Sequence, residues 1–357
     1  MSATDIDAAK VEEFAGMMVG YLNGGALCLL TSAGYQAGLF EAMAGLPPAT
    51  SAEIAEAAGL DERYVREWLA GMTVGGIVEH DPDAGTFHLP PEHAACLTKA
   101  AGPDDLGMFS QFIVQFADVE GDVLAAFRHG GGVPYSRYPR FQELMAAMSA
   151  GVLDSSLIDA VLPLVPDVVG RLETGGDVLD IGCGHGHAVN LIARAFPATR
   201  VIGYDLSEEA IEVARAEAVE VGLSNASFAV KDIRRLEEPG RYDLVTAFDV
   251  VHDLPEPAPV LASIHEALKP GGVFLMVDIA ASSHVHENLE HPIGPMLYTA
   301  SVFHCMSVSL AQGGVGLGTM WGEQLARSML ADAGFSDVRV ESVEGDIFNG
   351  YYVARKS

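Results

Sequence analysis

A glycine-rich segment follows the first of several short apolar runs in the second half of the chain. The run VLDI, residues 178–181, leads into Gly182, Gly184 and Gly186, and an amphipathic helical pattern follows. Glycines at such a strand-to-helix turn allow close approach of a ligand to the backbone, and the free amides at the helix start favour an anionic group. The spacing is G-x-G-x-G, because His187 breaks the dinucleotide-binding pattern G-x-G-x-x-G. The turn alone does not identify its ligand.

Two carboxylates follow at the ends of the next two apolar runs. Asp205 ends RVIGYD, and this carboxylate could accept hydrogen bonds from both hydroxyls of an adenosine ribose. Asp232 follows ASFAV and is placed for the adenine amino group, with Ile233 against the ring. Taken singly, each residue has a plainer interpretation as a helix-capping acid or a loop acid. Three such positions at three successive strand ends indicate a site for an adenosine-containing cofactor.

Strands alternating with helices must position these residues. From Asp177 onward the short apolar runs DVLDI, RVIGYD, ASFAV, YDLVTAF and VFLMVDI are each followed by a helical or turn segment. This order predicts a mainly parallel sheet covered on both faces. SDVRVES and YYVARK add two terminal strands. We therefore predict an α/β fold in which residues 171–357 form a Rossmann-like, seven-stranded domain.

The first hundred residues have a different pattern. A helical segment from about residue 5 to residue 46 contains many small residues, which let helices approach closely. Ser51 is the expected N-cap of AEIAEAAGL, Gly59 ends that helix, and Asp61 caps ERYVREWLAGM. IVEH, the turn DPDAG and TFHLP then form a hairpin. The order predicts a winged helix in residues 1–100, joined to the α/β domain by a helical segment, residues 101–170.

A winged helix can read DNA or serve packing and dimerisation. Reading DNA requires a basic recognition helix, but here Arg63 and Arg66 are offset by Asp61, Glu62 and Glu67. The chain also carries a net charge of -29, which repels phosphate backbones and anionic membranes. We therefore expect no nucleic-acid or membrane partner and, from the small-residue helices, a homodimer.

Composition also suggests a compartment. The four cysteines lie more than fifty residues apart without a C-x-x-C pair, which argues for a reducing environment. No basic region followed by an apolar stretch opens the chain, and no apolar run approaches the ~20 residues of a membrane span. We expect a cytoplasmic protein.

The second half resembles a known family. Residues 178–356 resemble the class I S-adenosylmethionine-dependent methyltransferases, and IHEALKPGGVFLMVDI is similar to their segment through the fifth strand. The resemblance implies that the glycine turn faces the methionine part of S-adenosylmethionine, Asp205 the ribose, and Asp232 the adenine. Phe248 would place aromatic surface near the sulfonium cation. The predicted cofactor residues are Ser149, Asp180, Gly182, Gly184, Gly186, Asp205, Leu206, Asp232, Ile233 and Phe248.

The first half extends this resemblance. PRFQELMAAMS is similar to the segment that precedes the cofactor domain in small-molecule O-methyltransferases with an N-terminal winged helix. The match assigns Ser149 to the cofactor carboxylate and Met145 to the substrate wall, whereas periodicity alone favours Phe141 and Met145 as core residues at i, i+4. The stretches GGGVPYSRYPRF, SSHVHENLEHP and HCMSVSLAQGG resemble an uncharacterised actinobacterial methyltransferase group, which implies no particular acceptor.

The same resemblance suggests a catalytic pair. AFDVVHDLPEP is similar to the segment whose His is the general base in those O-methyltransferases, which implies His252 as base and Asp278 as the acid that orients it. The second acidic partner of that family is not matched, since Met320 stands there and Glu323 follows three residues later. His252 could instead be a capping or structural histidine.

Residues 280–320 form an insertion too long for a plain connection. It holds several histidines, a cysteine and a glycine-rich stretch, and could be a substrate lid, a metal site or a dimer contact. Because no further ligand completes a recognisable metal spacing, we expect a lid and no metal. The predicted substrate residues are Met145, Asp249, His284, His304 and Trp321.

Three functions fit these observations. The leading hypothesis is S-adenosylmethionine-dependent methyl transfer to a small, apolar or aromatic acceptor, with oxygen favoured and nitrogen, carbon and sulfur open. A cofactor-sensing, DNA-reading regulator is the second. The third is an enzyme that keeps the fold and cofactor but runs other chemistry, because fold does not determine reaction.

Overall fold

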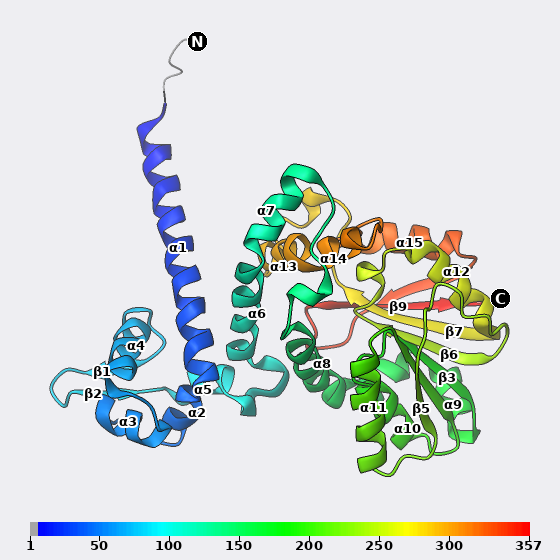
Figure 1. Cartoon of the computed structure of the whole chain (residues 1–357), viewed down its shortest axis with the longest axis horizontal. Coiled ribbons are helices and arrows are strands. Elements are labelled where there is room, and N and C mark those ends of the chain that lie inside the picture. Colours follow the sequence, from blue (N-terminus) through cyan, green and yellow to red (C-terminus); the bar gives the residue numbers. More distant parts are fainter. Residues whose placement is uncertain (1–5) are drawn as a thin grey trace. The chain divides into compact units, whose positions relative to one another are not determined.

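The computed structural model describes residues 6–357, apart from the side chains of Pro103, Gln142 and Val152. The chain forms two compact units, residues 1–117 and 118–357 (Figure 1). The helical segment that the sequence analysis placed between two domains is therefore divided between these units. Residues 1–5, where the predicted first helix begins, lie outside the described part of the chain.

A long helix opens the first unit. Helix α1 spans Ala8–Gln36 and is capped by Asp7, whose carboxylate accepts the backbone amides of Ala9 and Lys10. Only the C-terminal part of α1 is buried within this unit. There a Cβ at Gly34 would lie 2.3 Å from the Trp68 ring. The Trp68 indole donates to the carbonyl of Leu30 at 2.8 Å. Glycine at position 34 thus lets the tryptophan pack directly on the helix backbone.

The winged helix follows as predicted. It comprises α2 (Leu39–Ala44), α3 (Ser51–Ala58), α4 (Glu62–Val74), β1 (Glu79–Asp81), β2 (Thr86–His88) and α5 (Pro91–Leu97). Gly59 ends α3 in the left-handed conformation and Asp61 caps α4, as expected. The predicted cap Ser51 is wrong by one residue. Thr50 forms the cap, because it and Glu53 make a reciprocal capping box.

Helices α6 (Leu106–Asp118), α7 (Glu120–His129), α8 (Phe141–Ser156) and α9 (Pro166–Thr174) lead into the second sheet. This sheet contains β3 (Asp177–Ile181), β4 (Arg200–Asp205), β5 (Ala226–Val230), β6 (Tyr242–Phe248), β7 (Leu268–Ile279), β8 (Asp337–Glu341) and β9 (Asn349–Arg355). The strand order is β5-β4-β3-β6-β7-β9-β8. Strands β3 to β7 are parallel, and β9 is antiparallel to both β7 and β8. The prediction of a seven-stranded, Rossmann-like sheet is confirmed.

Both faces of this sheet are covered (Figure 1). One apolar core packs α10 (His187–Ala195), α11 (Glu208–Glu220) and the segment from α8 to α9 against the sheet. The other packs α12 (Pro257–Ala267) and α15 (Gly322–Asp332) against it. The order reverses at β3, with β4 on one side and β6 on the other, and ligands of such sheets bind at this point beyond the carboxyl ends of the strands.

The insertion after β7 is mostly helical. It contains α13 (Gly294–Ala300), a π-helical segment (Ser301–Cys305) and α14 (Met306–Ala311). The amide of Val133 donates to the Ser307 hydroxyl at 2.9 Å. The Tyr138 hydroxyl donates to the carbonyl of Phe303. This part of the insertion is therefore packed against the segment after α7.

Two helical stretches are long and apolar enough to cross a membrane by length and composition alone, namely α1 and Glu143–Leu164. The sequence-based expectation of no such stretch is corrected here, because both stretches have a mean hydropathy of 1.4. Core helices and signal sequences meet the same criterion, so the finding is weak evidence for a membrane.

A half-buried acid, Glu238, links β4, β6 and the segment after β5. Glu238 accepts hydrogen bonds from Tyr204 and Lys231, at 2.8 and 2.7 Å, and from Tyr242. Burial alone would raise the pKa of Glu238, but these bonds and the Arg241 charge outweigh it and lower the pKa to about 2. Since the pKa is depressed in the folded state, this acid stabilises the fold above its ordinary pKa and stops doing so as the pH falls.

We therefore expect Glu238→Gln to lower the free energy of unfolding at neutral pH by about 1 to 3 kcal/mol, because charged hydrogen bonds become neutral ones. The difference from the unaltered protein should shrink as the pH falls from 4.5 towards about 2. Urea unfolding, monitored by circular dichroism at several pH values, measures the free energy of unfolding and its dependence on pH. The exposed neighbour Glu237, changed to Gln, is the control, and an equal effect there would contradict the assignment.

Candidate active site

The glycine turn lies between β3 and α10 and has the conformation that its sequence predicts. Gly182, Gly184 and Gly186 have φ angles of 62°, 51° and 77°, which other residues rarely adopt. A Cβ at Gly182 would lie 2.6 Å from the Val250 side chain, and one at Gly186 would lie 2.5 Å from Phe228. A Cβ at Gly184 would meet nothing within 4 Å. The backbone thus packs tightly on both sides and is open at Gly184, as a cofactor cradle requires.

Asp205, at the end of β4, holds this turn. Its Oδ2 accepts the Gly184 amide at 2.9 Å and its Oδ1 accepts the Ser207 amide at 2.8 Å. Each carboxylate oxygen can accept a further hydrogen bond, so both remain able to receive ribose hydroxyls. Leu206 is 62% exposed beside it. The pair offers an anchored carboxylate next to an uncovered apolar side chain, which suits an adenosine.

The adenine side differs in one respect from the expectation. Asp232 lies at the surface and pairs with Arg234, whose guanidinium also contacts Glu256. Ile233 is only 7% exposed and packs in the core under the sheet. The side chain of Ile233, which was expected to contact the adenine ring, fills that core. The exposed apolar side chain next to Asp205 is that of Leu206.

Three residues line the carboxyl ends of β3 and β6. Asp180 is buried and accepts the Thr246 hydroxyl at 2.7 Å. Burial raises the pKa of Asp180 to about 7, in spite of that bond. Phe248 is half-buried. Asp249 has a φ of 55°, and its buried Oδ1 has no hydrogen-bond partner within residues 6–357. An unsatisfied buried oxygen at this edge is ready for a ligand's donor.

His252, just after β6, is held by a buried carboxylate. Its Nδ1 lies 2.7 Å from Oδ1 of Asp278, which ends β7. The same oxygen accepts the indole N–H of Trp321 at 3.0 Å and the Ile279 amide at 2.9 Å. Both His252 and Asp278 are buried. This places the proton of a neutral imidazole on Nδ1 and leaves Nε2 with a lone pair.

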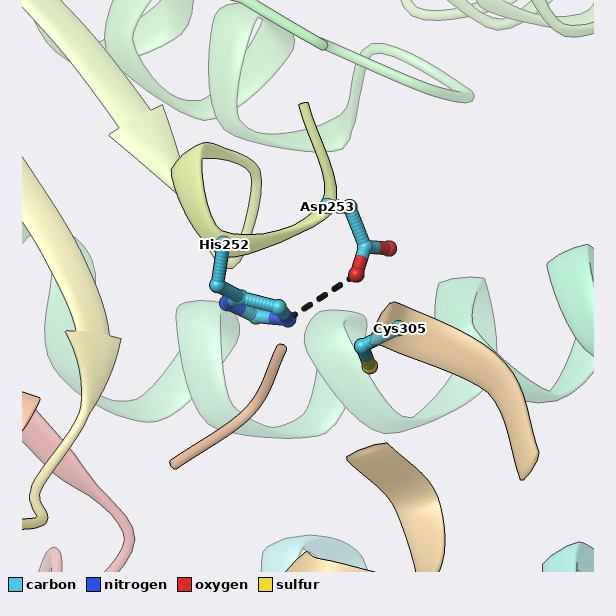
Figure 2. Close-up of side chains that lie close together, drawn as sticks. All are labelled: His252, Asp253 and Cys305. Atoms are coloured by element: carbon cyan, nitrogen blue, oxygen red, sulfur yellow. Dashed lines mark ion pairs between the residues drawn. The ribbon is translucent and has the colours of Figure 1, made fainter. Parts of the chain in front are cut away.

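The other side of His252 faces a second set of groups (Figure 2). Nε2 lies 3.4 Å from Oδ1 of Asp253, and the Cys305 thiol is close to both. Burial lowers the pKa of His252, but the charges of Asp278 and Asp253 outweigh it and hold the pKa well above its ordinary value. The charged form of the ring is therefore favoured, and its neutral form, with the Nε2 lone pair, is a stronger base than an exposed histidine.

An aromatic cluster surrounds His304 beside this pair. The His304 ring stacks on Phe141, with centroids 3.5 Å apart and planes 15° apart, and Tyr135 and Tyr138 contact its edge. Burial lowers the pKa of His304 to about 4, so the ring is neutral at physiological pH. Neither of its nitrogens has a hydrogen-bond partner among the described atoms.

The remaining predicted residues lie in different places. Ser149 and Met145 are half-buried on α8. His284 is exposed and stacks at 5.8 Å on His286, so nothing in the described structure brings it to His252. Trp321 is buried and contacts Asp278, so it supports the site from behind and does not line a substrate wall.

A cleft of about 520 Å³ lies elsewhere on this unit, near the end of β7 and the strands β8 and β9. Its lining includes Ser282, Asn288, His291, Glu323 and Glu341, and none of the predicted cofactor residues. The buried groups with shifted pKa, Asp180, Asp249 and His252, lie near the glycine turn and not in this cleft. We therefore place the active site at the glycine turn and His252.

Sequence reasoning missed Tyr135 and gave Trp321 a different role. Tyr135, in the stretch GGGVPYSRYPRF, donates its hydroxyl to Oδ2 of Asp253 at 3.2 Å. Trp321 supplies the hydrogen bond to Asp278 that was sought from a second acid, while Met320 is buried and Glu323 pairs with Arg327.

Two family models match the chain. Residues 25–99 match an Rv2258c-like winged HTH domain, and residues 172–334 match a methyltransferase domain. A ubiquinone biosynthesis O-methyltransferase of Leptothrix cholodnii is 35% identical over 114 residues, which cover 31% of this chain and 47% of the relative. The chain thus spans about half the length of this curated relative.

Solved structures match over nearly the whole chain. A putative O-methyltransferase from Nostoc punctiforme has a TM-score of 0.74 at 21% identity, covering 96% of this chain and 98% of that one. The S-adenosylmethionine-dependent methyltransferase SibL has a TM-score of 0.65 at 26% identity, covering 95% and 98%. The chain therefore joins a segment that matches an Rv2258c-like winged HTH domain, residues 25–99, to one that matches a methyltransferase domain, residues 172–334, and its fold is that of the solved methyltransferases.

Proposed function

We propose that this protein transfers the methyl group of S-adenosylmethionine to a hydroxyl of a small, apolar or aromatic molecule. One observation carries the proposal: the glycine turn with Asp205 and the His252–Asp278 pair lie at the same carboxyl edge of one sheet. When bound, S-adenosylmethionine supplies a methyl group on a positively charged sulfur. Alignment, exclusion of water and removal of the hydroxyl proton are then left to the protein.

The residues of the turn would hold the cofactor. Asp205 would receive the ribose hydroxyls, Leu206 and Asp232 would border the adenine, and Asp180, Asp249 and Ser149 would lie towards the methionine end. The unsatisfied Oδ1 of Asp249 supports this placement, because a buried acceptor is costly until a donor reaches it. The exposed apolar side chain of Leu206 supports it from the other end.

His252 would accept the proton of the acceptor hydroxyl. Asp278 orients the ring, and its charge stabilises the imidazolium that forms. Oxygen is favoured over nitrogen or sulfur because a neutral hydroxyl is the weakest nucleophile of the three and gains most from a base. The cluster of Tyr135, Tyr138, Phe141 and His304 lies beside the pair and suits a flat aromatic acceptor.

A role in reading DNA is less well supported. On α4, Arg63 pairs with Glu67 and Arg66 pairs with Glu62, so both arginines of the would-be recognition helix are engaged with acids. We propose that the winged helix serves assembly. The free state of all four cysteines accords with a cytoplasmic location.

The partner in that assembly would be a second copy of the chain. Val11, Phe14, Met18 and Leu22 follow one face of α1 at helical spacing, and each is at least 40% exposed. An isolated amphipathic helix gains most of its stability from burial of its apolar face. Pairing of α1 with its copy would cover this surface.

Asp205→Asn should weaken S-adenosylmethionine binding about 10- to 100-fold, because an amide replaces a charged acceptor worth about 1.5 to 3 kcal/mol. Calorimetric titration measures this, with Glu208→Gln on the exposed start of α11 as the control. Unchanged affinity in Asp205→Asn would remove the ribose assignment, and no binding to folded, unaltered protein would remove the proposed function.

His252→Ala should lower kcat by about 10²- to 10⁴-fold with phenolic acceptors, while the affinity for S-adenosylmethionine stays within about 2-fold. Asp278→Asn should also lower kcat, since the amide cannot stabilise the imidazolium. His286→Ala, at the exposed surface, is the control. A full rate in His252→Ala would point to a more nucleophilic acceptor that needs no base.

Replacing both Phe14 and Leu22 by Glu should convert a dimer into a monomer in sedimentation velocity experiments, because charges would enter the apolar face of α1. The neighbouring double change of Glu12 and Glu13 to Gln should leave the dimer intact. A monomeric unaltered protein would contradict the proposal, and pelleting with lipid vesicles would assign the same face to a membrane.

A further inference from the structure

Three different metal-binding side chains converge beside the proposed proton acceptor. Nε2 of His252, a carboxylate oxygen of Asp253 and Sγ of Cys305 all lie within 4.8 Å of one another. His252 and Asp253 come from the turn after β6, and Cys305 comes from the π-helical segment of the insertion (Figure 2). The cluster joins Cys305 of the insertion to His252 and Asp253, which lie 53 and 52 positions earlier in the chain.

The spacing of the donor atoms suits a tetrahedral ion. Zinc binds histidine nitrogen and carboxylate oxygen at about 2.0 to 2.1 Å, so two such donors on a tetrahedron lie about 3.3 Å apart. The Nε2 to Oδ1 distance is 3.4 Å. This distance is long for a hydrogen bond between nitrogen and oxygen, and Oδ1 of Asp253 has no hydrogen-bond partner in the described structure.

The surroundings of His252 are those of a metal ligand. A histidine that binds a metal through one nitrogen usually donates its other N–H to a carboxylate. Here Nδ1 lies 2.7 Å from Asp278, and Trp321 and the Ile279 amide fix that carboxylate in turn. Nε2 is thereby presented to Asp253 and Cys305 with its lone pair available.

The charge of the cluster also favours a cation. Asp249, Asp253 and Asp278 lie around His252, so acidic side chains outnumber basic ones in this cluster. Unpaired Oδ atoms remain on all three acids within residues 6–357. His304, fully buried with both nitrogens unbonded, lies 4.0 Å from Asp253. Burying such groups without partners costs several kcal/mol, which a divalent ion and its bound oxygen would offset.

We propose that His252, Asp253 and Cys305 bind one Zn²⁺ ion, with the fourth position open to a water or an acceptor oxygen. Binding releases to solvent the proton of the Cys305 thiol and, from the protonated form of His252, the proton on Nε2, because the thiolate and the neutral imidazole are the ligands. One consequence rests on the function proposed above. Since Nε2 has a single lone pair, a zinc-bound His252 cannot accept the acceptor's proton, so zinc inhibits O-methyl transfer.

Metal binding itself tests the site without any acceptor or cofactor. Metal-free protein is titrated with ZnCl₂ by calorimetry, and bound metal is counted after dialysis. We expect one tightly bound ion per chain, weakened at least about 100-fold in Cys305→Ser, and about 10- to 100-fold in Trp321→Phe, which loosens Asp278. Cys96→Ser and His286→Ala, which alter a cysteine and a histidine outside the cluster, should bind zinc as the unaltered protein does. Loss in His286→Ala instead would assign the ion to the exposed histidines and overturn the proposal.

Cobalt in the unaltered protein gives a second readout if Cys305→Ser fails to fold. Co²⁺ bound to Cys305 in a tetrahedral site should show a thiolate-to-metal charge-transfer band and intense visible absorption. Absence of the charge-transfer band would overturn the site. Zinc binding without S-adenosylmethionine binding would refute only the proposed function, and the reverse result would refute only the metal site.

Discussion

The buried carboxylate of Asp278 is the interaction on which the rest of the candidate site depends. It is fully buried, and its Oδ1 receives hydrogen bonds from the ring of His252, the indole of Trp321 and the Ile279 amide. These donors come from the turn after β6, the end of the insertion and β7 itself. Removing any of them would leave a buried charge less well compensated. One acid thus ties the proposed base to the insertion that surrounds it.

The order of the strands provides the second constraint. Because β4 and β6 lie on opposite sides of β3, the strand order reverses there, and sheets of this type bind their ligands at this point beyond the carboxyl ends of the strands. The glycine turn, Asp205 and Asp249 all follow strands that meet at this edge. A fold of this type brings a cofactor and a base together, but it does not determine the reaction, so the chemistry rests on His252 and its neighbours.

Sequence reasoning succeeded where a residue's role depends on its own strand or helix. The seven strands, the glycine turn, the winged helix and the pairing of His252 with Asp278 all follow from local patterns or from family resemblance. It failed where a role depends on packing between distant segments. Ile233 is taken up by the core, Trp321 turns to Asp278, and Cys305 reaches His252 across 53 positions of chain. Periodicity carries no information about such contacts, whereas the one-residue difference between the predicted cap Ser51 and the observed cap Thr50 depends only on local hydrogen bonds.

The two uses proposed for Nε2 of His252 share one physical origin. Asp278 fixes the ring with its proton on Nδ1 and adds negative charge, which makes Nε2 both a stronger base and a better metal ligand. If the pair of His252 and Asp278 served only proton transfer, it would not need Asp253 and the buried thiol of Cys305 on the far side of the ring. Their presence there means that this histidine cannot be treated as a simple copy of a general base. The site could act on a hydroxyl only while the lone pair of Nε2 is free to accept a proton, and a metal ion bound there would prevent this.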